Sequence, residues 1–222
     1  EYRYEMKYAV SPYTADLLKK QLGLVMQKDP HSLSADYSYD IRSLYFDDPL
    51  ASAYYEKLEG LEFRKKYRLR IYNYSDQVIK LECKHKDENM TYKEDCTINR
   101  QVAEAIITGQ YGLIRSQRDF LNQFIADALT YPLKPSVIVD YRRTAYVYPV
   151  SEVRITFDEN IRSGRYDLDF FNPDNNLLPV EENTIMEVKC NEFIPAHILA
   201  VLAAEPKVRV AISKFAASCS VR

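Results

Sequence analysis

The 222-residue sequence has no tryptophan and only five glycines, and it contains neither a P-loop nor the G-x-G-x-x-G fingerprint of dinucleotide-binding folds. Its four cysteines, at positions 83, 96, 190 and 219, are widely spaced and form no C-x-x-C pair. That spacing argues against a disulfide framework and against a zinc cage. These absences argue against a fold built on a glycine-rich nucleotide loop, and they favour reduced thiols in a cytoplasmic compartment.

The charge balance and the hydropathy exclude two further classes of protein. The 30 basic and 32 acidic residues give a formal net charge of -2, so the surface cannot be uniformly basic, as it is in many nucleic-acid-binding proteins. Any anion site must arise by segregating the charges. No apolar run approaches the roughly 20 residues that span a bilayer, and the sequence opens directly into a strand-like pattern. We expect a chain in the cytoplasm or at the cytoplasmic face of a membrane, with a membrane-associated partner or a fused segment left open.

Aromatic content and hydrophobic periodicity predict a strand-rich fold. Nineteen tyrosines and nine phenylalanines are typical of strands. No internal repeat or Pro/Gly/Ser linker divides the chain, so we expect one domain over residues 1–222. Period-two alternation predicts strands at 2–10, 41–48, 63–74, 78–86, 91–98, 136–148, 153–162 and 184–190. Helical periodicity and capping residues predict helices at 11–26, 51–60 (ending near Gly60), 100–109 and 116–129, one that opens at Pro195, and one from about Ala211.

These elements predict an α+β fold that is mainly β. The strands follow one another closely, so most neighbouring strands should be antiparallel. Closure into a barrel is the economical arrangement, because it removes the exposed edges of a sheet. We therefore expect a closed, antiparallel, eight-stranded β-barrel with helices at its periphery.

Basic residues concentrate on one face of several predicted strands. Successive side chains of a strand point to opposite faces, so residues 64–70 separate their bases from Tyr67 and Leu69. Three other strands divide in the same way. The residues that share the polar faces are Arg64, Lys66, Arg68 and Arg70; Lys80, Glu82, Lys84 and Lys86; Arg154, Thr156 and Asp158; and Glu187 and Lys189.

An ordinary sheet with one solvated face is the alternative interpretation, since half-buried sheets commonly expose Lys and Arg. A solvated face of a nearly neutral protein should mix signs, however, because neighbouring like charges repel. Residues 64–70 contain no acid. A polyanion would neutralise such a cluster, and phosphate suits it because Arg binds phosphate oxygens with two N–H groups. The pattern favours a barrel with a basic interior and an apolar outside.

Eight short segments also resemble a known family. They are RYEMKY at 3–8, YFD at 45–47, YRLRIY at 67–72, LECK at 81–84, YRRTAY at 141–146, VRITFD at 153–158, MEVK at 186–189 and ISKF at 212–215. Each is weak alone, but their order and spacing together are specific. They resemble the triphosphate tunnel metalloenzymes, and among these the VTC-type polyphosphate polymerase domains of eukaryotic vacuolar transporter chaperone complexes and of bacteria.

The resemblance implies a tunnel lined by phosphate-binding residues. Because Arg142 and Arg143 are adjacent, only one of them can face inward, and the motif selects Arg143. A surface lysine at a helix end is an equal alternative for Lys214, which lies outside the strand pattern. Glu187 would hold a Mn²⁺ or Mg²⁺ ion. The implied phosphate-binding residues are Lys7, Arg68, Arg70, Lys84, Lys93, Arg143, Arg154, Lys189 and Lys214, of which Arg68, Arg70, Lys84, Arg143 and Arg154 would be catalytic.

The implied activity is ATP-dependent transfer of the γ-phosphoryl group onto a growing inorganic polyphosphate chain. Hydrolases of the same superfamily carry E-x-E-x-K on the first strand, whereas this chain has Arg3, Glu5 and Lys7. A base in place of the first acid weakens the hydrolase interpretation, and the role of Glu5 stays open. A triphosphatase or nucleotide hydrolase, a non-catalytic polyphosphate sensor and a purely structural barrel are the alternatives.

The histidines argue against a histidine-based catalytic centre. His31, His85 and His197 are expected on a loop, on the apolar face of a strand and in a terminal helix. Phosphoryl transfer has a loose transition state, which positioning and electrostatic stabilisation can lower without a protein nucleophile. The sequence therefore predicts catalysis by the Lys and Arg residues of the strands.

Overall fold

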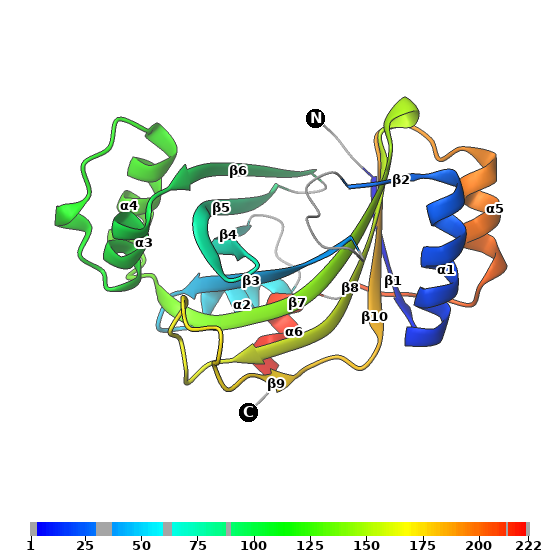
Figure 1. The fold of residues 1–222 in the computed structure, drawn as a ribbon. Helices are drawn as coiled ribbons and strands as arrows, with labels where there is room; N and C mark the ends of the chain where they lie inside the picture. The colour runs from blue at the N-terminus through cyan, green and yellow to red at the C-terminus, as the bar shows by residue number, and fades with distance from the viewer. Residues whose placement is uncertain (1–3, 30–36, 60–63, 88–89, 212, 221–222) are drawn as a thin grey trace. The chain divides into compact units, whose positions relative to one another are not determined.

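The computed structural model describes residues 4–29, 37–59, 64–87, 90–211 and 213–220 (Figure 1). Its eight long strands are β1 (Tyr4–Val10), β3 (Ser38–Asp47), β4 (Arg64–Tyr72), β5 (Ser75–Asp87), β6 (Met90–Ile98), β7 (Lys134–Tyr148), β8 (Val153–Gly164) and β10 (Thr184–Cys190). Three strands have two residues each: β2 (Gln27–Lys28), β9 (Leu178–Pro179) and β11 (Val208–Arg209). All eight strands predicted from the sequence are present, with bounds shifted by at most a few residues.

The helices of the described residues also follow the sequence pattern. Ser11 caps α1, and its Oγ accepts a hydrogen bond of 3.1 Å from the Thr14 N–H. The final helix begins at Lys214, not near Ala211, and the predicted helix end near Gly60 lies outside the described residues. The helices are α1 (Pro12–Val25), α2 (Ser52–Leu58), α3 (Arg100–Ile107), α4 (Asp119–Thr130), α5 (Ala196–Ala204) and α6 (Lys214–Ser220), with 3₁₀ turns η1 (Tyr111–Leu113) and η2 (Pro149–Ser151).

The strands form a sheet in the order β11-β1-β10-β8-β7-β3-β4-β5-β6, with β2 beside β7 and β9 beside β8. The pairs β1–β10, β1–β11, β8–β10, β2–β7, β3–β4, β4–β5 and β5–β6 are antiparallel. This confirms a mainly β, antiparallel fold. Within the described residues no pairing joins β6 to β11, so the sheet order is open. The predicted closure into a barrel is not confirmed.

Two compact units divide the chain, each assembled from separate segments. Unit 1 contains residues 1–40, 141–161 and 179–213, and unit 2 contains residues 41–140, 162–178 and 214–222. Strands β3, β7 and β8 contribute residues to both units. The single domain expected from the sequence therefore stays a prediction, and each unit is described by itself below.

The core of unit 2 forms on the apolar side of β4 and β5. Tyr67, Leu69 and Ile71 alternate with bases along β4, and all three are buried. They pack with Leu81 of β5 and Phe124 of α4 in one cluster, to which α3 also contributes. Full burial of such a side chain contributes roughly 1.5–3 kcal/mol. This packing fixes which face of β4 and β5 is left for the charged residues.

The core of unit 1 is built in the same way from β8 and β10. Ile155 of β8 and Val188 of β10 are fully buried against Leu18 and Leu22 of α1 and Ile198 of α5. Helices α1 and α5 lie side by side (Figure 1). The opposite faces of β8 and β10 again carry the polar side chains.

A buried arginine organises one side of unit 2. Arg42 of β3 is 1% exposed, and its Nε and Nη2 donate to the two carboxylate oxygens of Asp140, each at 2.8 Å. Its Nη1 donates to the Phe170 carbonyl at 3.3 Å, to Asn175 Oδ1 at 3.1 Å and to the Asn172 carbonyl. The guanidinium therefore ties the segment after β8 to β3 and β7.

Candidate functional site

The strand register of unit 2 assembles a cation-rich face. Directly opposed residues of antiparallel strands share a face. One row across β4, β5 and β6 consists of Lys66, Lys84 and Lys93, with no acid between them. Over the described pairs of these strands the face carries the bases Arg64, Lys66, Arg68, Arg70, Lys80, Lys84, Lys86 and Lys93 and the acids Glu82 and Asp95.

A buried carboxylate lies at the centre of this face. Glu82 Oε2 accepts from Arg68 Nε at 2.6 Å and lies 3.6 Å from Arg70 Nη1, and its Oε1 accepts from Lys93 Nζ at 3.1 Å. Burial opposes ionisation of Glu82, but the three cations outweigh it and lower its pKa to about 2. The carboxylate stays charged at neutral pH and holds both guanidinium groups in place.

The hydroxyl of Tyr45 adds a neutral polar group to the same face. It accepts a hydrogen bond of 2.9 Å from Arg68 Nη1. Burial alone would raise the pKa of Tyr45, but the charges of Arg68, Arg70 and Lys214 lower it below its ordinary value of 10.0. The shift reflects positive potential at this point. Phe215, which follows Lys214 in the chain, packs on Tyr45 with ring centroids 5.1 Å apart.

The register of unit 1 gives a second polar face, which we call the unit 1 grid. It consists of three rows across β1, β10 and β8: Glu5, Lys189 and Arg154; Lys7, Glu187 and Thr156; and Ala9, Ile185 and Asp158. Acids and bases are mixed more evenly here than on the face of unit 2. The middle of the grid is occupied by Glu187.

Glu187 is 8% exposed and is surrounded by cations. Lys189 Nζ lies 2.7 Å from Glu187 Oε1, and Lys7 Nζ lies 4.0 Å from Oε2. The same two ammonium groups lie 3.8 Å and 3.0 Å from carboxylate oxygens of Glu5. Burial raises the pKa of Glu187, but the charges of Lys189, Lys7 and Arg143 lower it by more, so its pKa lies below the ordinary value. Glu187 and Glu5 therefore share one pair of lysines.

Two arginines of unit 1 are held by buried acids. Arg143 forms a bidentate pair with Asp158, at 2.6 Å and 2.8 Å. Arg154 Nη2 donates to Asp29 Oδ2 at 2.7 Å and lies 3.4 Å from the Tyr39 hydroxyl. Fixing a guanidinium in this way leaves its remaining N–H groups oriented for another acceptor.

Arg142 precedes Arg143 on β7, so its side chain points to the opposite face of the strand. It is exposed, and its Nε donates to Ser38 Oγ at 2.6 Å. Arg143 instead reaches Asp158 of the unit 1 grid. The phosphate-binding role of Arg143 stays a prediction.

The predicted site residues fall into two groups. Unit 2 brings together Arg68, Arg70, Lys84, Lys93 and Lys214, and unit 1 brings together Lys7, Arg143, Arg154, Glu187 and Lys189. Lys84 is exposed to solvent. Period-two alternation already predicted Glu82, Thr156 and Asp158 on the polar faces, although no site role was predicted for them. Tyr45 was part of a motif but was not predicted as a site residue, and Asp29 carried no signal.

The remaining sequence-based expectations concern Arg3 and the histidines. Arg3 and His31 lie outside the described residues. His85 is buried on the apolar side of β5, where its ring stacks on Tyr92 at 4.3 Å, and His197 lies in α5. Neither belongs to the two cation-rich groups.

We compared the sequence of this chain with models of known protein families. The VTC domain model matches residues 2–221. The chain belongs to the VTC domain family. A search of curated proteins finds no match to this VTC domain.

Solved structures give more distant matches. A Bacillus halodurans protein described as a candidate adenylate cyclase is 12% identical and has a TM-score of 0.51, with 91% of this chain and 87% of that chain covered. At this identity the likeness supports the fold alone. The PH1819 protein of Pyrococcus horikoshii OT3 is also 12% identical, with a TM-score of 0.44 and coverage of 91% and 85%. A score at that level carries no argument.

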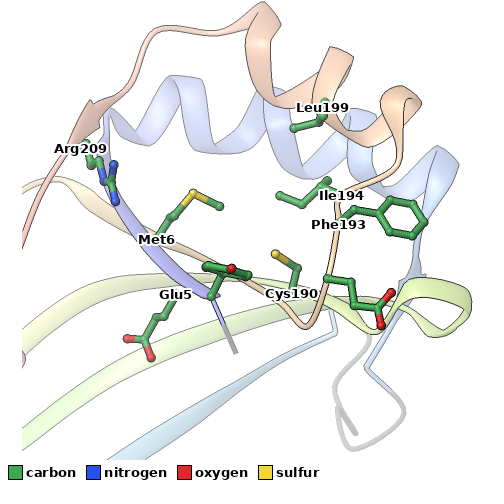
Figure 2. A pocket seen from close by; sticks show the side chains of 9 residues that line it. Glu5, Met6, Cys190, Phe193, Ile194, Leu199 and Arg209 are labelled. Atoms are coloured by element: carbon green, nitrogen blue, oxygen red, sulfur yellow. The ribbon is translucent and has the colours of Figure 1, made fainter. Parts of the chain in front are cut away.

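Unit 1 also contains a pocket of about 330 Å³ (Figure 2). Met6 and Cys190, on the apolar side of β1 and β10, line it with Ile194 and Leu199. The lining also includes one base, Arg209, beside the acids Glu5 and Glu192. It therefore does not offer the convergent cations that a phosphate chain requires. The candidate site is therefore the set of charged strand faces and not this pocket.

A divalent ion fits the unit 1 grid in a limited way. No cluster of three or more His, Cys, Asp or Glu side chains suited to a metal occurs among the described residues. Glu5 and Glu187 are the two carboxylates that share Lys7 and Lys189. Mg²⁺ is usually held by one or two carboxylates together with water and substrate phosphates. The donor set suits a hard cation that arrives with phosphate, and it does not suit a zinc site.

Proposed function

We propose that this VTC domain is a polyphosphate polymerase, which transfers the γ-phosphoryl group of ATP to the end of an inorganic polyphosphate chain. The observation that carries the proposal is the row of Lys66, Lys84 and Lys93 on adjacent strands. Directly opposed like charges destabilise a sheet. A phosphate chain repeats its negative charge along its length, so it would offset the repulsion over the whole row.

The arginines supply the positioning that phosphoryl transfer needs. Arg68 and Arg70 are held by Glu82, and Arg143 and Arg154 are held by Asp158 and Asp29. Each guanidinium would bind non-bridging phosphate oxygens with its remaining N–H groups. Charge on these oxygens in the transition state would meet donors that are already oriented, which is the main source of catalysis in such reactions.

Glu187 and Glu5 would hold the Mn²⁺ or Mg²⁺ ion in this proposal. When bound, such an ion neutralises charge on the phosphoryl group and its leaving group. Lys7 and Lys189, which now pair with these carboxylates, would turn to phosphate oxygens. In the absence of the metal, the two lysines stabilise the charged form of Glu187.

Closure of the sheet into the barrel expected from the sequence is part of this proposal, together with a location on the cytoplasmic side, where ATP would be supplied. A closed barrel would surround the phosphates with the polar strand faces and limit the access of water. No helix within the described residues is long and apolar enough to cross a membrane.

A triphosphatase is the second candidate, because Glu5 lies beside the same lysines as Glu187. Two neighbouring carboxylates could bind metal and position water as the acceptor. Arg3, at the sequence position where hydrolases of the superfamily carry a further acid, counts against this activity. The two candidate activities therefore differ in the molecule that accepts the phosphoryl group, which is polyphosphate in the polymerase and water in the triphosphatase.

The test is to incubate the purified domain with ATP and Mn²⁺ and to follow ADP, free phosphate and long-chain polyphosphate in the same sample. ADP with polyphosphate supports the polymerase, and ADP with free phosphate supports the triphosphatase. No turnover with tight binding of tripolyphosphate would favour a sensor.

Two adjacent arginines supply a matched control for this assay. Arg143→Lys keeps a charge beside Asp158 but loses the bidentate fork, so turnover should fall strongly. Arg142→Ala removes an exposed side chain that bonds Ser38, so turnover should persist. Equal losses in both variants would contradict the assignment of Arg143 to the site.

A further inference from the structure

A buried hydroxyl in unit 1 has no hydrogen-bond partner. Thr156 is 5% exposed, and its Oγ1 has no partner among the described residues. An unsatisfied buried polar group costs roughly 1–3 kcal/mol. Valine has nearly the same shape and would avoid this cost. A threonine at this position therefore calls for a partner that comes from outside the chain.

The surroundings of Thr156 indicate what that partner is. Thr156 lies between Arg154 and Asp158 along β8 and directly opposite Glu187 of β10. In the neighbouring row of the grid, Lys189 lies opposite Arg154. The orphaned hydroxyl thus shares a face with strong cations, which is where an anionic ligand would bind.

A neutral donor has an advantage beside Glu187. Lys189 Nζ donates to Glu187 Oε1 at 2.7 Å, and Lys7 Nζ lies at ion-pair distance from Oε2, at 4.0 Å. Phosphate oxygens close to Glu187 meet its negative charge, so they need a donor that the carboxylate has not engaged. The hydroxyl of Thr156 is such a donor, since it has one O–H and no charge of its own.

We propose that Thr156 is a phosphate-binding residue, whose Oγ1–H donates to a phosphoryl oxygen held by Arg154 and Lys189. This inference rests on the proposed function and deepens it, because it assigns a specific contact to the phosphate beside Glu187. The hydroxyl forms a hydrogen bond when the ligand is bound. Without the ligand it stays buried and unsatisfied, which lowers the stability of the folded protein. Binding and stability should therefore respond in opposite directions when the hydroxyl is removed.

The test compares Thr156→Val with the wild-type domain, using inorganic tripolyphosphate as the probe. Calorimetry should show affinity reduced about tenfold or more, which is the effect of losing one hydrogen bond to a charged group. The midpoint of thermal unfolding without ligand should be unchanged or higher. Thr156→Ser, which restores the hydroxyl, should keep the affinity within about twofold of wild type.

Thr184→Val is the matched control, because Thr184 is also buried in this sheet but lies on the apolar side of β10 with Met186. Its affinity for tripolyphosphate should equal that of wild type. If the wild type binds and Thr156→Val binds equally well, the role of Thr156 is overturned while the proposed function stands. A lower unfolding midpoint for Thr156→Val would also overturn it, by showing a structural role. If the wild type itself fails to bind tripolyphosphate, the proposed function is overturned.

Discussion

Replacing Glu82 with Gln tests how the cation-rich face of unit 2 is stabilised. The carboxylate is 3% exposed and pairs with Arg68 at 2.6 Å, Lys93 at 3.1 Å and Arg70 at 3.6 Å. Glutamine keeps the shape but removes the negative charge. The variant leaves three cations with no acid at their centre, so we expect lower stability and a stronger attraction for polyanions.

The pKa of Glu82 gives the size of the effect. It falls from an ordinary 4.5 to about 2 in the folded protein, which corresponds to about 3 kcal/mol at 1.36 kcal/mol per tenfold change. Because the folded-state pKa is the lower one, this stabilisation is present above the unfolded pKa and is lost as pH falls from about 5 to about 2. Glu82→Gln should therefore unfold about 3 kcal/mol more easily at pH 7, and the difference should shrink below pH 5.

Urea unfolding monitored by circular dichroism between pH 7 and pH 3 measures this difference. Glu94→Gln is the matched control, because Glu94 lies on the adjacent strand with a side chain that is 50% exposed, and it should change stability by less than about 1 kcal/mol. Tripolyphosphate should stabilise Glu82→Gln more than wild type, since it binds the folded state and meets no competing carboxylate. A loss no larger than that of Glu94→Gln, or a gap that stays constant down to pH 3, would refute the reasoning.

Two further predictions concern unit 1. Arg154→Ala should lower tripolyphosphate affinity at least tenfold and cost about 3 kcal/mol of stability, because the buried Asp29 loses its partner at 2.7 Å. Adding Asp29→Asn should restore the thermal midpoint but not the affinity measured by calorimetry, and recovered affinity would mean that Arg154 serves Asp29 alone. Glu187→Gln should weaken Mn²⁺ activation of turnover far more than polyanion binding, since a divalent cation prefers a carboxylate ligand. Equal losses in the two assays would contradict this division of roles.

The parts of the fold that follow from local periodicity could be predicted. The alternation of Arg68 and Arg70 with Leu69 specifies which side of β4 packs against α4, because one-residue slips would bury the charges. The same reasoning separated Arg154 from Ile155 on β8. Ser11 and Pro12 likewise mark the start of α1 through local hydrogen bonding.

The partners of these side chains could not be predicted in the same way. The bond between Arg154 and Asp29 joins residues 125 positions apart, and it depends on β2 adding to the sheet beside β7. A two-residue strand has too little sequence to show a period. The orphaned hydroxyl of Thr156 was hidden for a related reason, since the absence of a partner is a property of the packed structure and not of the strand pattern.

Arg42 changes what is expected of the irregular segment that follows β8. Long connections with little regular structure usually tolerate shortening, and residues 165–177 contain neither a helix nor a strand. Here the carbonyls of Phe170 and Asn172 and the side chain of Asn175 complete the solvation of a fully enclosed guanidinium. A shortened variant would take away the acceptors of the buried Nη1 group while the pair with Asp140 remained. The connection is therefore as much a part of the interior of unit 2 as the strands on which it packs.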